Sequence, residues 1–262
     1  MKWLGVGYRG ELRDWLFGQP AEVKSLEITA EHFFDGGDDV LRDLSAIYPL
    51  FVHGLGLSLG TPGRLCEQTL DNFARVADMA DAQWVSEHVS FTRSKEVDLG
   101  HLNPVLMNEA SLSVLVDHAI EVAQRCNRPL VLENVTSSLQ MAGDFSETDF
   151  LNQLCQRAGC GLLLDVTNLF INSKNHGYEA SAWLREIDTN NIRQLHVVGY
   201  TLKNGRYHDH HSAPIQPDLM ELVAEVLECC DVDAVTLERD ERLDAIDEIR
   251  AELHKLECLS VG

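Results

Sequence analysis

Side chains with metal-binding chemistry recur at the ends of short apolar segments along this chain. His53 and Glu133 each close such a segment, as does Asp165, and His196 interrupts another. Imidazole and carboxylate groups gathered in one place suit iron, manganese or zinc better than magnesium or calcium. Unpaired carboxylates would repel one another and resist desolvation, and bound cations reverse that cost. The segment ends therefore predict a metal centre.

The set of such residues is larger than one ion can use. It comprises His53, His88, Glu133, Asp165, His196, Asp209, His211 and Glu238. A single His or Glu at a strand end is more often a hydrogen-bonded structural group, so the prediction rests on the whole set. We expect two or three ions, with Glu133 near the middle of the set and able to bridge two of them. The set contains no Cys, which argues against an iron–sulfur cluster.

Eight short apolar segments carry these residues, and near-continuous apolar runs are typical of parallel strands covered on both faces. The predicted strands are Trp3–Gly7, Ser25–Ile28, Leu50–His53, Gln83–Glu87, Pro129–Glu133, Gly161–Asp165, Gln194–Val198 and Ala234–Glu238. Between them, helices are predicted at about 10–18, 38–47, 63–81, 108–126, 146–158, 179–187, 216–230 and 241–256.

Alternation of eight strands with eight helices predicts a single (β/α)₈ TIM barrel of class α/β, with residues 1–262 forming one domain. A doubly wound open sheet is the main alternative. Longer loops are predicted at Phe91–Met107, Val135–Ser146, Val166–Tyr178 and Tyr200–Gln216. All four follow strands, so they would lie on the face where the strands end, which is where such barrels place their active sites.

The formal net charge of −21 argues against a nucleic-acid partner, since contact with a phosphate backbone needs clustered Lys and Arg. The seven cysteines include no C-x-x-C pair, which argues against a structural zinc site or a secreted disulfide framework. The N-terminal segment lacks the apolar core of a signal peptide, and no apolar run is long enough to span a membrane. We therefore expect a soluble, cytoplasmic protein with no membrane partner.

One glycine-rich motif, residues 54–60, resembles a phosphate-binding loop but matches the spacing of neither common type. We interpret it as a tight turn that lets the backbone approach the site. Ser86 and His88 lie two residues apart on one predicted strand and can both face inward. We rank His88 as a metal ligand above a general base.

The segments together resemble the multinuclear non-heme iron-dependent oxidases, TIM-barrel enzymes that modify ribosomally made peptides. The motifs that carry the resemblance are HGLGLSLG at 53–60, SEH at 86–88, LEN at 132–134, GCGLLLDVTN at 159–168, LHVVG at 195–199 and ERD at 238–240. With the GVG at 5–7, the resemblance covers most of the chain.

The resemblance implies a ligand set and one acid for proton handling. The implied ligands are His53, His88, Glu133, Asp165, Asn168, His196, Asp209, His211 and Glu238. The family pattern of Asp, spacer and His selects Asp209 and His211, although neighbouring His208 and His210 leave that register open. Asp240 matches a family acid near the site, and a salt bridge with Arg239 or another base is an equal alternative for it.

The resemblance also implies the activity: oxidation of cysteine residues in a precursor peptide, with dioxygen and two to three iron ions in a mixed Fe²⁺/Fe³⁺ state. The compact length resembles the catalytic subunit of methanobactin biosynthesis, which makes an oxazolone and an adjacent thioamide. A separate leader-binding partner protein, forming a heterodimer, is implied as well.

Other functions remain open on the residues alone. A trinuclear zinc hydrolase of the phosphodiesterase type uses a similar barrel and donor set, although the acidic charge disfavours a DNA substrate. A metal-dependent sugar isomerase shares the fold, and fold alone cannot exclude it. The last alternative is a barrel without activity that serves as a binding module.

Overall fold

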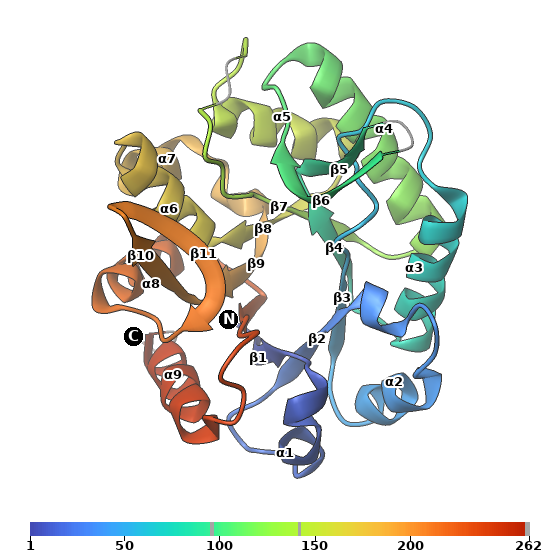
Figure 1. The fold of residues 1–262 in the computed structure, drawn as a ribbon, viewed down its shortest axis with the longest axis vertical. Coiled ribbons are helices and arrows are strands. Elements are labelled where there is room, and N and C mark those ends of the chain that lie inside the picture. The colour runs from blue at the N-terminus through green and yellow to red at the C-terminus, as the bar shows by residue number, and fades with distance from the viewer. Residues whose placement is uncertain (95–96, 141–142, 260–262) are drawn as a thin grey trace.

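Eight parallel strands close into a barrel in this computed structural model, which describes residues 1–94, 97–140 and 143–259 (Figure 1). The barrel strands are β1 (Trp3–Gly7), β2 (Ser25–Thr29), β3 (Leu50–His53), β4 (Val85–His88), β7 (Leu130–Glu133), β8 (Gly161–Asp165), β9 (Ile192–Val197) and β12 (Ala234–Leu237). Each strand pairs with its sequence neighbours in the barrel, and β1 closes it against β12. The predicted TIM barrel is confirmed, and the open sheet is excluded.

Helices surround the barrel on its outer side (Figure 1). They are α1 (Arg13–Phe17), α2 (Asp38–Ser45), α3 (Glu67–Met79), α4 (Glu109–Cys126), α5 (Glu147–Ala158), α6 (Val166–His176), α7 (Ala180–Glu186), α8 (Pro217–Cys229) and α9 (Ile246–Leu259), with single 3₁₀ turns at Gly10–Leu12, Ala30–Phe33 and Thr189–Asn191. Each predicted helix is found. The last one begins at Ile246, five residues later than predicted.

The predicted loop at 166–178 is wrong, because α6 occupies most of it. The Asp165 side chain caps this helix by accepting the backbone N–H of Asn168, and the helix ends at Gly177 with φ 74°. The residues from Val166 to Ser173 are all buried. A helix buried on all sides lacks the polar face that makes helical periodicity visible in a sequence.

Two predicted loops contain hairpins that stand over the barrel mouth. They are β5 (Ser90–Ser94) with β6 (Val97–Pro104), and β10 (Gly199–Lys203) with β11 (Arg206–Ala213). Asn204 and Gly205 join the second pair, both at positive φ, which is the usual chemistry of a two-residue hairpin turn. Residues 95–96 and 141–142 of the predicted loops lie outside the described residues.

The two ends of the barrel interior differ in chemistry. At the amino ends of the strands, Phe51 stacks on Trp84 with ring centroids 4.1 Å apart, and Trp3 packs against both. At the carboxyl ends the interior is filled by imidazoles and carboxylates. The described residues include no helix long and apolar enough to cross a membrane. All seven cysteines are free thiols.

Candidate metal centre

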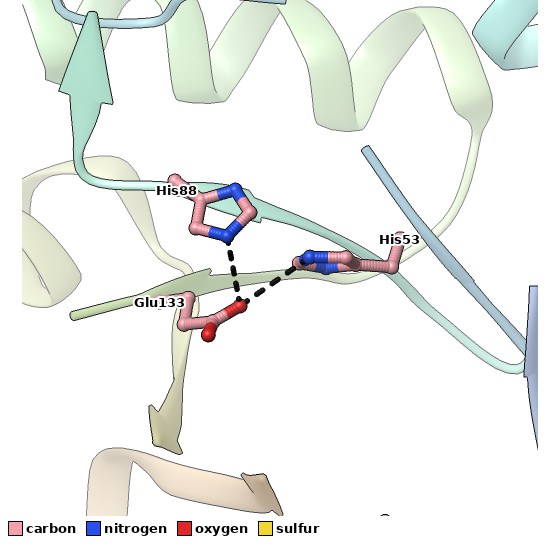
Figure 2. Close-up of side chains that lie close together, drawn as sticks. All are labelled: His53, His88 and Glu133. Atoms are coloured by element: carbon pink, nitrogen blue, oxygen red, sulfur yellow. Dashed lines mark ion pairs between the residues drawn. The ribbon is translucent and has the colours of Figure 1, made fainter. Parts of the chain in front are cut away.

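Three side chains from neighbouring strands form the first donor group of the site (Figure 2). His53 ends β3, His88 ends β4 and Glu133 ends β7. The β4–β7 register places His88 directly opposite Glu133. Nε2 of His53 lies 3.4 Å, and Nε2 of His88 lies 3.3 Å, from the same Oε2 atom of Glu133. All three side chains are buried.

These separations fit ligands of a shared ion better than hydrogen bonds. Hydrogen bonds from nitrogen to oxygen are typically about 2.9 Å long. Zinc and similar ions bind nitrogen and oxygen at about 2.0–2.2 Å, which separates adjacent ligand atoms by about 3.0–3.5 Å. Neither imidazole makes a hydrogen bond to Glu133 Oε2, which is buried without a hydrogen-bond partner among the described residues. An ion between the three groups would satisfy it.

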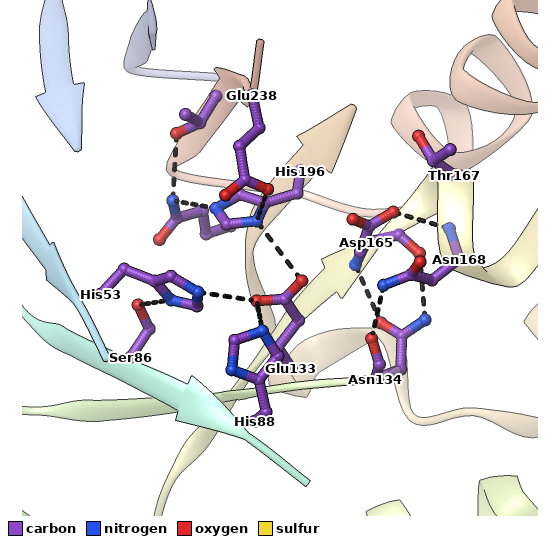
Figure 3. Close-up of polar contacts among 12 residues, drawn as sticks. His53, Ser86, His88, Glu133, Asn134, Asp165, Thr167, Asn168, His196 and Glu238 are labelled. Carbon is purple, nitrogen blue, oxygen red and sulfur yellow. Dashed lines mark hydrogen bonds and ion pairs between the residues drawn. The ribbon is translucent and has the colours of Figure 1, made fainter. Parts of the chain in front are cut away.

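A second donor group shares Glu133 with the first (Figure 3). It adds Asp165 at the end of β8, His196 on β9 and Glu238 just after β12. The strand register pairs Asp165 with His196. Nδ1 of His196 lies 3.0 Å from Glu238 Oε2 and 3.5 Å from Glu133 Oε1. The two oxygens of Glu133 thus face different groups, which is the arrangement of a bridging carboxylate.

A buried chain of hydrogen bonds holds the His196 ring at the Nε2 side, away from the donor group. Nε2 of His196 lies 2.7 Å from Glu27 Oε1, and Glu27 Oε2 accepts from Gln194 Nε2 at 2.6 Å. Gln194 in turn accepts the indole N–H of Trp84 at 2.6 Å. Because Glu27 engages Nε2, the Nδ1 atom is the one presented to the donor group. Such outer partners fix the tautomer and the ring orientation of metal-binding histidines.

Outer partners also position the remaining donors. His53 Nδ1 hydrogen-bonds to the hydroxyl of Ser86 at 2.8 Å, which leaves Nε2 facing Glu133. Asn134 brackets Asp165: its Oδ1 accepts the Asp165 N–H, and its Nδ2 donates to the Asp165 carbonyl. The Asn168 amide donates to the carbonyl of Asn134, so its Oδ1 is left without a partner among the described residues.

The glycine-rich turn packs against the same edge of the site. The N–H of Leu57 donates to Glu87 Oε1 at 2.7 Å, next to His88. Gly54 permits this approach, because a Cβ there would lie 2.8 Å from the Phe73 ring and 3.0 Å from Glu87 Cγ. This agrees with a turn that brings backbone to the site.

The loop after β9 contributes Asp209 and His211 from β11. Nε2 of His211 lies 3.0 Å from Asp209 Oδ1, and both residues line a mouth cavity of about 310 Å³. His208 and His210 do not line that cavity, and their rings stack on each other with centroids 5.8 Å apart. The structure therefore places Asp209 and His211, the pair selected by the family pattern, toward the site.

Asp240 lies on the rim of this cavity, where it pairs with another base, Arg9, and not with Arg239. Its carboxylate accepts from Arg9 Nε at 2.7 Å and lies 3.2 Å from His211 Nδ1. Arg239 instead points away from the mouth and pairs with Glu248 and Glu252 of α9. Strand alternation explains the split, since adjacent residues face opposite sides. Arg9, Glu27 and Asn134 received no role from sequence reasoning; only Asn134 lay in a quoted motif.

The electrostatics of the cluster reflect burial without a fixed positive charge. Burial alone would lower the pKa of His88, but Glu133 and Glu87 raise it to about 9. Burial, followed by the nearby carboxylates of Asp209 and Glu133, raises the pKa of Asp165 well above its ordinary value. Burial and the neighbouring histidines lower that of His53. Metal binding requires deprotonated ligands, so a bound cation would displace the protons that the raised pKa values of His88 and Asp165 favour.

The buried polar atoms that have no hydrogen-bond partner indicate what kind of ligand the site would bind. Among the described residues, the buried atoms without a hydrogen-bond partner include Glu133 Oε2, Asp165 Oδ2, Asn168 Oδ1, His196 Nδ1, Asp209 Oδ1 and His211 Nδ1. Buried polar groups without partners are rare and costly. These six belong to residues of the predicted ligand set and concentrate at one mouth, so the donors present fit metal ions.

A closed barrel with this donor cluster at its mouth defines a TIM-barrel enzyme with a candidate metal centre. The chain belongs to a family of enzymes that modify precursors of ribosomally synthesised peptides: the sequence pattern of the RiPP precursor modification enzyme MbnB/TglH/ChrH family matches residues 3–260. A UPF0276 protein of Chromobacterium violaceum is 30% identical over 98% of this chain and 95% of its own length. One from Rhizorhabdus wittichii is 30% identical over 95% and 91%.

Similar solved structures share the fold at low sequence identity. A D-psicose 3-epimerase from Clostridium cellulolyticum is 12% identical, with a TM-score of 0.68 over 98% of this chain and 99% of its own. Endonuclease IV from Thermus thermophilus is 16% identical, with a TM-score of 0.63 over 97% and 99%. Identities this low support the barrel fold alone and transfer no chemistry.

Proposed function

We propose that this enzyme is an iron-dependent, dioxygen-using oxidase that modifies cysteine residues of a ribosomally synthesised precursor peptide. Formation of an oxazolone and an adjacent thioamide is the product class that the family resemblance suggests. The observation that carries the proposal is Glu133, whose two carboxylate oxygens face two different groups of buried donors. Membership of the precursor-modification family supports a peptide as substrate.

The proposed ligands divide into three sets. His53, His88 and Glu133 would hold one ion, and Glu133, Asp165, His196 and Glu238 a second. Asn168, Asp209 and His211 would hold a third, which their unpaired atoms and their place on the cavity wall support. When bound, iron would supply one-electron chemistry with dioxygen. Nitrogen and oxygen donors alone also suit manganese and zinc, so the choice of iron rests on the family resemblance.

The chain's own residues would prepare the substrate. A cysteine thiol entering the mouth meets a site whose cations would favour its thiolate form. Asp240 is ionised at neutral pH, because its pKa is lowered by His211 and Arg9 against the effect of burial. We propose that it accepts a proton at the rim, where it is half-buried and contacts His211. Arg9 restores charge balance there.

A separate leader-binding protein, forming a heterodimer with this chain, is part of the proposal. It rests on the family resemblance alone. Such a partner would present the precursor, and the barrel would supply the donor cluster and the mouth.

The test is an assay of iron-loaded enzyme with a Cys-containing precursor peptide, sought among short open reading frames near its gene. Mass spectrometry should show a changed peptide mass under air and none under strict anaerobiosis. Full turnover without any oxidant would contradict the oxidase. Tightly bound zinc together with phosphodiesterase activity would favour the hydrolase instead.

A further inference from the structure

Four of the segments beside the mouth differ in charge and polarity from the chain as a whole. Four strand-to-helix segments, 54–66, 89–108, 134–146 and 198–216, contain five Lys or Arg and four Asp or Glu, a net charge of +1 against −21 for the whole chain. The large hydrophobic residues that are exposed in the described part of the chain all lie in these segments: Leu55, Val97, Leu106, Leu139 and Leu202. Clustered exposed apolar side chains typically mark an interaction surface.

A continuous depression crosses this face from the donor cluster outward. The mouth cavity shares Leu102, Thr136 and Asp209 with a groove of about 380 Å³ that runs between β6 and β11. β6 of one hairpin and β11 of the other contribute to its lining, together with residues 136–139 and α6. A groove between two strands suits an extended chain, which side-chain pockets can then read at alternate positions.

The groove continues into a side cavity of about 170 Å³. Pro104, Ser137 and Leu139 line both, and Val135, two residues beyond Glu133, lines the side cavity and the mouth. The walls are mainly apolar, with Val89, Met107, Phe145 and Leu151 among them. An apolar cavity of about 150 Å³ is known to accept benzene, so this volume admits one aromatic ring or branched aliphatic group.

The charge of the side cavity restricts its occupant. Glu147 lies in its wall and accepts the Trp183 indole N–H at 2.8 Å. Burial raises the pKa of Glu147, which shows that charge is disfavoured at this position. An anionic side chain in this cavity would be poorly solvated and would lie near the Glu147 carboxyl group. The cavity therefore selects an apolar group over an anionic one.

We propose that the substrate peptide lies extended in the groove between β6 and β11, with an apolar side chain next to the reacting residue held in the side cavity beneath Leu139. This inference rests on the proposed function in one respect, that the substrate is a peptide whose reacting residue enters the mouth. It adds the path of the bound substrate peptide and the chemical character of the residue next to the reacting one. The side cavity is then a specificity subsite.

Leu139 and Leu202 provide a matched pair for the test. Both are exposed leucines of mouth segments, at 68% and 60%, so neither substitution removes core packing. Leu139 lines the groove and the side cavity, whereas Leu202 lines neither. The same change, Leu139→Asp or Leu202→Asp, adds the same charge at both places.

The experiment measures binding of fluorescein-labelled heptapeptides Gly-Ser-Xaa-Cys-Xaa-Ser-Gly to the full chain by anisotropy under anaerobic conditions. Xaa is Phe, Leu, Gly or Asp, on both sides of the cysteine so that chain direction does not matter. The Phe and Leu peptides should bind about tenfold or more tightly than the Gly peptide, the usual discrimination of an apolar pocket, and the Asp peptide weakest. Leu139→Asp should abolish this preference, and Leu202→Asp should leave it within about twofold.

Equal binding of the Phe and Gly peptides would overturn the inference, as would equal effects of the two variants. The latter would point to a diffuse apolar surface or to a docked partner protein instead. Binding is measured without turnover, so a failure of iron uptake or of peptide oxidation contradicts the proposed function and leaves this result standing. Normal oxidation with no Phe preference removes only the subsite.

Discussion

Glu238 and Arg239 are adjacent residues just after β12, and they belong to two different buried clusters of charged residues. The two clusters compensate their buried charge in different ways. Glu238 turns into the mouth with His196 and Glu133. Arg239 turns outward under α9, where it pairs with Glu248 at 2.7 Å and with Glu252. Both Glu238 and Arg239 are buried, but the second cluster has a permanent positive charge at its centre, whereas Arg9 stands at the rim of the first.

The contrast lies in how the polar atoms are satisfied. In the Arg239 cluster, Glu252 also accepts the N–H of Ile215 at 2.6 Å, and only Nε of Arg239 has no partner within the described residues. The mouth cluster leaves several atoms unpaired at separations of 3.3–3.5 Å. We interpret the Arg239 cluster, which contains its own cation, as structural, and the mouth cluster as a candidate site for a bound cation.

The largest expected effect separates the two donor groups of the mouth. His53 belongs only to the first and Glu238 only to the second, so His53→Ala and Glu238→Ala should each lose one ion and reduce activity more than about 100-fold. Elemental analysis and a peptide assay measure both. His254→Ala, at an exposed histidine of α9, is the control. A His53 variant with full metal content and activity would remove that residue from the site.

Breaking the structural cluster should affect stability and leave metal binding unchanged. Arg239→Met leaves Glu252 buried without its cation, which typically lowers the free energy of unfolding by about 3–5 kcal/mol. Urea unfolding measures this. Arg242→Met removes an exposed partner of Glu248 and should cost about 1 kcal/mol or less. Loss of metal in a folded Arg239→Met protein would contradict the division between the clusters.

The chain behind His196 should tune metal affinity without supplying a ligand. Glu27→Gln keeps the size of the side chain but weakens the contact with His196 Nε2. Metal affinity should fall by about 10–100-fold, the usual effect of removing an outer partner. Competition with a chelator measures it. Glu22→Gln, which affects only a pairing with Arg250, should leave the affinity unchanged.

The remaining effect is in the pH dependence of stability. Without metal, the raised pKa of His88, about 9, stabilises the fold fully below its unfolded pKa of about 6.5, and this contribution is lost as pH rises through 9. Metal binding requires deprotonated imidazole, so affinity should rise over the same range. Melting curves of chelator-treated protein should therefore decline from pH 6.5 to 9, and His88→Gln should flatten that trend. An unchanged slope in His88→Gln would show that another group titrates.

The barrel and the clustering of the candidate donors could be predicted because both follow local rules. Apolar segments that end in His53, Glu133 or Asp165 mark strand and site together, since all carboxyl ends of the strands meet at one face. The α6 helix could not be recognised by amphipathic periodicity, because its first eight residues are all buried. The Asn204–Gly205 pair is a common hairpin-turn sequence, but the composition of the surrounding segment led to the prediction of a loop.

Contacts that form only when the barrel closes could not be predicted from the sequence. The pairing of Glu27 with His196 joins residues 169 positions apart across the barrel interior. The Arg9–Asp240 ion pair joins opposite ends of the chain, and no local pattern marks Arg9. The partners of Arg239 depend on where α9 begins, and this helix begins five residues later than predicted.

The most direct test of the central claim is an anaerobic titration of chelator-treated wild-type protein and Glu133→Gln with ferrous iron. If Glu133 bridges two donor groups, the wild type should bind at least two ions per chain, and the variant should lose the tight binding of both. A Glu133→Gln protein that binds as much iron, and as tightly, as the wild type would contradict the account.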